Sequence, residues 1–175
     1  MQRCLLFAVL LVLVLTEPRH DALATGQAAP PPACPRTTEA ENLALARAWH
    51  EEVINRRNPG ALRDILAPEV VHHAAGGYPK VMNAAGVASM MNDFLTAFPD
   101  LRYGFDKWIV RDDHVVERYT ATGTQKGQLG GTPPSGRQAT WTGINIFRIA
   151  CGRIAEVWSE VDAVSRARQL TTAPR

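Results

Sequence analysis

The sequence predicts an α+β domain whose N-terminal helices pack on one face of a curved, mainly antiparallel sheet. Three observations predict this fold class. Apolar residues recur at helical spacing from residue 38 to residue 98, they alternate with a period of two after residue 100, and two short turns divide that second half into hairpins. Helices and strands that are segregated along the chain in this way are typical of α+β domains.

The first 24 residues have the features of a signal peptide. Arg3 gives a positive start, Cys4 to Leu15 form an apolar run, and Ala22-Leu23-Ala24 offers the small residues that precede a signal peptidase site. The alternative is a retained membrane anchor, but the apolar run falls short of the ~20 residues that span a bilayer. We therefore expect residues 1–24 to be removed and the mature protein to be secreted or periplasmic, without a membrane attachment.

Residues 25–37 are predicted to form a tether ahead of the domain, which spans residues 38–172. The tether is rich in Ala and Pro and has no periodicity, as expected for an extended segment. Once Cys4 is lost with the signal peptide, Cys34 and Cys151 remain as an even pair in an oxidising compartment. A disulfide and two unpaired thiols both stay open, because the sequence cannot place the two α-carbons within the ~7 Å that bridging requires.

The first helix is predicted to begin after Thr38, because Thr38 and Glu41 match a capping box. Leu45, Trp49 and Val53 then recur every four residues and mark its buried face. The Asn-Pro-Gly segment at residues 58–60 is expected to end this helix.

A short helix over residues 61–66 and a strand over residues 69–73 are predicted next. The following helix ends at Pro99, because proline lacks the N–H donor and clashes with the preceding turn. Its buried face is marked by Val87, Met91, Phe94 and Phe98.

Two hairpins are predicted after residue 100. Strands over residues 101–111 and 114–122 flank the turn Asp112-Asp113, and strands over residues 138–150 and 153–161 flank Cys151-Gly152, where glycine supplies a positive φ. A last helix over residues 163–170 follows.

The second hairpin carries a mixed aromatic and polar face. If Cys151-Gly152 is the turn, Trp141 lies opposite Asp162, Asn145 opposite Trp158, and Phe147 opposite Glu156, all on one face of the sheet. The other face is apolar and holds Ile144, Ile146, Ala155, Val157 and Val161. The mixed face is predicted to form the floor of a small-molecule cavity. The alternative is that its polar members contact solvent while the Trp residues pack on helices.

The charge pattern gives no sign of a nucleic-acid partner. The net charge is +2, from 19 basic and 17 acidic residues, and the basic residues are scattered rather than clustered.

A metal site at His72-His73 is not expected either, because adjacent side chains of a strand diverge and no further ligand cluster accompanies them. His50 and His114 are expected at the surface.

An ordered set of short motifs resembles the SnoaL-like ester cyclases, from about residue 41 to residue 170. The set consists of Phe98-Pro99-Asp100, Gly123-Thr124, residues 127–137 (GQLGGTPPSGR), Phe147-Arg148, Gly152-Arg153-Ile154, Glu156-Val157-Trp158 and Asp162. The resemblance implies the cone-shaped α+β barrel of the nuclear-transport-factor-two-like superfamily, whose members often form homodimers. It also implies that the Gly/Pro-rich segment is a loop at the rim of the pocket.

The resemblance implies catalysis without a cofactor. In the polyketide cyclases of the family, an aspartate near the end of the last strand runs an intramolecular aldol closure, and Asp162 occupies the matching place. A carboxylate in an apolar cavity can remove a proton α to a carbonyl and return a proton to the alkoxide. The alternative role for Asp162 is to cap the helix that follows. His73 matches a histidine common in the family after the first short strand, and is the second catalytic candidate.

One departure changes the expected site. Gln125 stands where relatives commonly carry histidine, so a neutral amide that can hydrogen-bond a carbonyl joins Trp158, Trp141 and Asn145 as expected substrate-binding residues. Two functions therefore stay open. The first is an exported acid–base enzyme of cyclase, isomerase or hydrolase type, acting on a small apolar carbonyl or ester compound. The second is a non-catalytic protein that binds a small apolar molecule in the same cavity.

Overall fold

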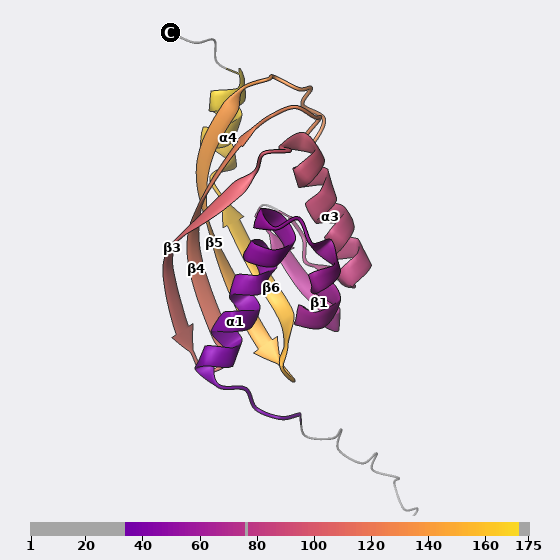
Figure 1. Cartoon of the computed structure of the whole chain (residues 1–175), viewed down its shortest axis with the longest axis vertical. Coiled ribbons are helices and arrows are strands. Elements are labelled where there is room, and N and C mark those ends of the chain that lie inside the picture. Colours follow the sequence, from indigo (N-terminus) through magenta and orange to yellow (C-terminus); the bar gives the residue numbers. More distant parts are fainter. Residues whose placement is uncertain (1–33, 76, 172–175) are drawn as a thin grey trace, which may run out of the picture. The chain divides into compact units, whose positions relative to one another are not determined.

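The computed structural model describes residues 34–75 and 77–171 of the chain (Figure 1). The predicted signal peptide, residues 1–24, and most of the predicted tether lie outside the described residues. The elements are helices α1 (Glu39–His50), α2 (Leu62–Ile65), α3 (Ala84–Ala97) and α4 (Ala163–Thr171), and strands β1 (Leu66–Ala74), β2 (Lys80–Met82), β3 (Arg102–Arg111), β4 (His114–Thr124), β5 (Gln138–Ala150) and β6 (Arg153–Val161). A turn of π-helix, Glu51–Asn55, extends α1, and a turn of 3-10 helix, Pro59–Ala61, precedes α2.

The strands form one six-stranded sheet in the order β2-β1-β6-β5-β4-β3. All neighbours are antiparallel except β1 and β6, which are parallel. Figure 1 shows α1 lying across the sheet, with α3 beside β1. The predicted α+β class, with helices packed on a mainly antiparallel sheet, is confirmed.

The local signals that predicted α1 and the hairpins are present. The Glu41 N–H donates to Thr38 Oγ1 at 3.2 Å, and the Thr38 N–H donates to Glu41 Oε2 at 2.8 Å, which is the predicted capping box. Both predicted hairpin turns form, with a positive φ at Asp112, Cys151 and Gly152. Strand β2 and the π-helical turn were not predicted.

The predicted register of the β5–β6 hairpin is wrong beyond its first two pairs. Next to the turn, Ile149 pairs with Ile154 as expected, but a bulge then shifts the pairing, so that Arg148 pairs with Glu156 and Asn145 pairs with Ser159. A slip of one residue moves every following side chain of the strand to the other face of the sheet. Ser159, and not Trp158, therefore shares a face with Asn145.

A glycine in β5 makes room for a tyrosine in β4. Gly143 pairs directly with Tyr119, and a Cβ at Gly143 would overlap the Tyr119 hydroxyl and lie 2.7 Å from the carbonyl oxygen of Glu160. We expect Gly143→Ala to lower the free energy of unfolding by about 1–3 kcal/mol, the usual effect of overpacking a core. Urea unfolding measures it.

The matched control for this substitution is Gly104→Ala. A Cβ at Gly104 in β3 meets only the carbonyl oxygen of Thr120, at 3.8 Å, which is ordinary contact. This control should unfold at or slightly above the wild-type urea midpoint. Equal midpoints for Gly143→Ala and the wild type would contradict the packing described for Tyr119.

Cys34 and Cys151 form a disulfide, which decides between the two alternatives that the sequence left open. The bond joins the segment before α1 to the tip of the β5–β6 hairpin, across a sequence separation of 117 residues.

None of the helices in the described part of the chain is long and apolar enough to cross a membrane.

Candidate functional site

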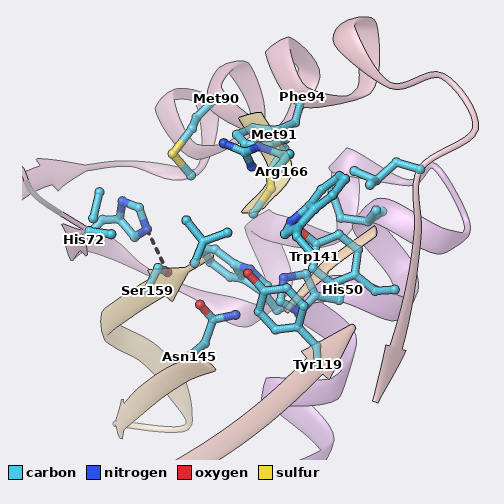
Figure 2. Close-up of a pocket in the computed structure, with 17 residues that line it drawn as sticks. His50, His72, Met90, Met91, Phe94, Tyr119, Trp141, Asn145, Ser159 and Arg166 are labelled. Carbon is cyan, nitrogen blue, oxygen red and sulfur yellow. Dashed lines mark hydrogen bonds between the residues drawn. The ribbon is translucent and has the colours of Figure 1, made fainter. Parts of the chain in front are cut away.

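A cavity of about 210 Å³ lies between the helices and the inner face of the sheet (Figure 2). Much of its wall is apolar, and the large apolar side chains include Trp49, Ile54, Met90, Met91, Phe94 and Leu101. Its polar groups are His50, His72, Tyr103, Tyr119, Asn145, Ser159 and Arg166, together with the indole of Trp141. A mainly apolar wall with a few convergent polar groups is typical of sites for small organic molecules.

A fully buried carboxylate lies against this cavity. The side chain of Glu117 is 0% exposed, and that of His50 is 4% exposed. The Asn145 side-chain amide donates to Glu117 Oε1 at 2.7 Å, and His50 Nδ1 lies 2.7 Å from the same oxygen. His50 Nδ1 is close enough to Glu117 Oε1 for an ion pair, but the angle between the two groups does not meet the requirement for a hydrogen bond. A buried carboxylate is unfavourable unless it is compensated, and His50 and Asn145 compensate Glu117 in part: both contact Oε1, whereas Oε2 is buried without a hydrogen bond to a described residue.

Three elements bring these groups together. Strand β4 alternates inward and outward, so Glu117 takes a core position between the inward-facing Val115 and Tyr119. Asn145 of β5 is its direct cross-strand partner. His50 is the last residue of α1, next to the buried Trp49. The expectation that His50 lies at the surface is wrong. The last residues of α1 pack against the sheet, and His50 is buried there together with Trp49.

The ring of His50 is held by aromatic neighbours. It stacks on Tyr103 with ring centroids 4.3 Å apart and lies 5.5 Å from the ring of Tyr119. Burial and, to a smaller extent, the nearby Glu117 raise the pKa of Tyr119 to about 12, so the hydroxyl stays protonated at neutral pH. Neither ring nitrogen of His50 forms a hydrogen bond with another described residue, and the buried Nδ1 has only its contact with Glu117. Nε2 is therefore free to meet a ligand while Nδ1 faces the carboxylate.

A second histidine reaches the cavity from β1. His72 Nε2 lies 3.2 Å from Ser159 Oγ of β6, the contact that is dashed in Figure 2. Burial lowers the pKa of His72 below its ordinary value of 6.5, and electrostatic interaction with the nearby His73 and Lys80 lowers it further. The imidazole of His72 is therefore neutral at neutral pH.

Acidification should destabilise the protein through His72. Because its folded-state pKa lies below the ordinary 6.5, the unfolded chain binds the proton more readily in this range. The stabilisation is complete above about pH 6.5 and is lost as the pH falls toward the folded-state pKa. Urea unfolding at about pH 7.5 and about pH 5 should show a smaller difference for His72→Gln than for the wild type. His114→Gln, at a half-exposed position, is the control that should keep the wild-type difference. An unchanged pH dependence in His72→Gln would contradict this assignment.

The structure separates the predicted site residues. Trp141 and Asn145 line the cavity, whereas Trp158 and His73 do not. His73 and Trp158 stack on each other with ring centroids 4.9 Å apart, and His73 Nε2 contacts Glu156 at 2.8 Å. Strand alternation turns His72 inward and His73 outward, so His72 lines this cavity and His73 does not, and the catalytic role of His73 stays a prediction.

Asp162 and Gln125 also lie outside this cavity. Asp162 is exposed after the end of β6, and its Oδ1 accepts from the Ser165 N–H at 2.9 Å, so it caps α4, the alternative role weighed from the sequence. Gln125 is buried and lines a neighbouring hollow with Leu129, Gly130 and Thr132 of the Gly/Pro-rich loop. The catalytic role of Asp162 therefore stays a prediction.

Sequence reasoning missed Glu117 and Ser159. Glu117 could have been found as the one acidic residue among apolar ones on the inward face of β4. Ser159 could not have been found from the sequence, because the bulge decides which face of the sheet it lies on.

Among the described residues, no group of three or more His, Cys, Asp and Glu side chains could hold a metal ion.

Solved structures with the same fold include several bacterial proteins. A candidate SnoaL-like polyketide cyclase of Jannaschia sp. CCS1 superposes with a TM-score of 0.72 at 19% identity, over 80% of this chain and 99% of that chain. TsrD of Streptomyces laurentii gives 0.69 at 28% identity, over 78% and 99%. IdmH of Streptomyces antibioticus, a candidate polyketide cyclase, gives 0.63 at 27% identity, over 78% and 100%. No curated protein matches this chain significantly.

The family model for SnoaL-like polyketide cyclases matches residues 44–170, which hold α1 from its second turn, the whole sheet and most of α4. The match includes the cavity and the cluster around Glu117. The chain therefore belongs to the SnoaL-like polyketide cyclase family.

Proposed function

We propose that this protein is a cofactor-free acid–base enzyme, and that His50 and Glu117 transfer the proton in the cavity. One observation carries the proposal: a fully buried carboxylate lies 2.7 Å from an imidazole whose other nitrogen has no partner among the described residues and whose ring lines the cavity. A carboxylate on one side of the ring stabilises the imidazolium that forms when the other nitrogen takes a proton.

The reaction that this pair supports begins at a carbon next to a carbonyl. His50 Nε2 removes the α proton, and the electron pair of the C–H bond forms an enolate. The Tyr119 hydroxyl, protonated at neutral pH, can donate a hydrogen bond to the enolate oxygen. In a ring closure, the enolate carbon attacks a second carbonyl of the same molecule, a C–C bond forms, and the new alkoxide takes the proton back from Nε2. Proton and electrons balance without an external oxidant or reductant.

Of two similar solved structures, one carries a name that supports the reaction class and the other names a different reaction. IdmH is a candidate polyketide cyclase, and AclR of Streptomyces galilaeus, at 25% identity and a TM-score of 0.67 over 79% of this chain and 89% of that chain, is a candidate hydroxylase. These names describe IdmH and AclR and are not transferred to this chain. For this chain we propose the step that ring closure and isomerisation share, which is removal of an α proton.

Deuterium exchange tests the proposal without knowledge of the natural substrate. β-Tetralone is a bicyclic ketone with exchangeable α protons, and its exchange in deuterium oxide is followed by proton NMR. We expect the wild-type protein to accelerate exchange above the buffer rate. If β-tetralone binds, as isothermal titration calorimetry would show, but exchanges at the buffer rate, the protein is a non-catalytic binding protein and the proposal fails.

We also propose that the protein is exported. The motivation is the signal-like segment at residues 1–24 together with the disulfide between Cys34 and Cys151, because disulfides persist mainly in oxidising compartments. Edman sequencing of the mature protein should begin at Thr25. An intact Met1 on membrane-bound protein would contradict export.

A further inference from the structure

Arg166 brings a positive charge into the wall of the cavity. It lies on α4, and its guanidinium sits over the rings of Phe94 and Trp141, 5.4 Å and 5.2 Å from their centroids. Figure 2 shows it beside Met91 and Phe94, with Tyr119 and Asn145 on the other side of the cavity. The two aromatic faces hold the guanidinium plane in place, because a cation is attracted to the face of an aromatic ring.

This charge has no anionic partner in the described part of the chain. Arg166 Nη1 is buried and makes no hydrogen bond to another described residue, and no described carboxylate forms an ion pair with Arg166. The buried Glu117 faces His50 instead, and Asp162, one turn earlier, caps the helix. Burial lowers the pKa of Arg166 below its ordinary value, but a guanidinium remains charged in proteins.

A second donor in the same wall also lacks a partner. The indole Nε1 of Trp141 is buried without a hydrogen bond to a described residue. Buried donors are nearly always satisfied, and a cation withdrawn from water, as the half-buried Arg166 is in part, is unfavourable unless an anion compensates it. Two such donors in one cavity indicate a ligand that supplies an acceptor with negative charge. A neutral carbonyl could accept from Trp141, but it would leave the charge of Arg166 uncompensated.

We propose that the ligand of this cavity carries a carboxylate, which Arg166 and Trp141 bind, on a body that the apolar wall accepts. The planar fork of a guanidinium matches the geometry of a carboxylate. With the carboxylate held there, the ligand extends toward Tyr119 and Asn145, on the side where His50 contacts Glu117. The inference rests on the proposed function only in taking this cavity as the substrate site.

Calorimetric titration with a matched pair of ligands tests it. α-Naphthylacetate and α-naphthylacetamide have nearly the same shape and differ in charge. We expect the wild type to bind the carboxylate about 10–100-fold more tightly than the amide, the usual value of hydrogen bonds to a charged group. Arg166→Gln keeps a planar amide over Trp141 and should bind the two ligands about equally.

Arg168→Gln is the matched control. Arg168 is exposed on the same helix and does not line the cavity, so this variant removes one positive charge from α4 at a position outside the wall. It should keep the wild-type preference for the carboxylate. If Arg166→Gln does not fold, Trp141→Phe keeps an aromatic ring but removes the Nε1–H donor together with part of the indole, and it should reduce the preference several-fold.

Three results would overturn the inference. The wild type binds both ligands equally, or Arg166→Gln keeps the full preference for the carboxylate, or neither ligand binds at millimolar concentration. In the first two cases the cavity still binds ligands, and the deuterium-exchange assay decides the acid–base proposal separately. The third result also counts against this cavity as the substrate site.

Discussion

Replacing His50 by glutamine should slow the exchange of β-tetralone α protons about 10²–10⁴-fold, which is the usual contribution of a general base. Glutamine has a similar length and can still donate a hydrogen bond toward Glu117, but it cannot take a proton at neutral pH. Affinity for β-tetralone, measured by calorimetry, should change little because the apolar wall is unaltered. The exchange rate would then fall without a matching loss of binding.

A second variant separates catalysis from folding. In His50→Gln, the fully buried Glu117 keeps Asn145 but loses the imidazole, so the variant is expected to be less stable. The double variant His50→Gln/Glu117→Gln also removes the carboxylate, so that neither ionisable group of this pair is left in the core. It should regain stability in urea unfolding but not regain exchange. A folded His50→Gln protein that exchanges at the wild-type rate would exclude His50 as the base.

Breaking the disulfide should lower the free energy of unfolding by about 2–5 kcal/mol. The bond closes a loop across 117 residues, and in the chain-entropy model a long loop restricts the unfolded chain most. Cys34→Ser is the better single variant, because Cys151 occupies the turn with a φ of +53° and should be left unchanged. The free thiol of Cys151 is alkylated before urea unfolding.

The matched control is the reduced wild type. Wild-type protein with dithiothreitol should unfold at the same urea concentration as Cys34→Ser, since both lack the same bond. A midpoint for Cys34→Ser equal to that of the oxidised wild type would show that the bond contributes nothing to stability.

The fold could be predicted because each element carries its own local signal. The capping box at Thr38 and Glu41 sets the start of α1, and the turns at residues 112–113 and 151–152 set the hairpins. These signals act over a few residues and do not depend on the rest of the chain. Strand β2, with three residues at the edge of the sheet, has too few residues for a detectable alternation.

The site could be predicted only in part, because it depends on register. Trp141 and Asn145 lie on the predicted inner face of β5, where alternation alone places them. One extra residue in β6 then exchanges Trp158 for Ser159 on the facing strand. The bulge lies only two pairs from the turn of this hairpin, and neither the turn nor the alternation of apolar residues gave warning of it.

The cluster at Glu117 shows a second limit. A charged residue in a strand is usually exposed, and His50 follows the apolar Trp49, so neither attracts attention alone. Their burial is tolerated only because Glu117, His50 and Asn145 meet in space. Such mutual compensation between α1, β4 and β5 is a property of the tertiary structure.

The most direct test of the account compares Asp162→Asn with His50→Gln in the same deuterium-exchange assay. Asparagine at position 162 keeps the oxygen that caps α4, so both the fold and the cavity should be retained. The account predicts that Asp162→Asn exchanges β-tetralone at the wild-type rate and that His50→Gln exchanges it at or near the buffer rate. Exchange lost in Asp162→Asn and retained in His50→Gln would contradict it, and would assign the proton transfer to the carboxylate at the end of the last strand.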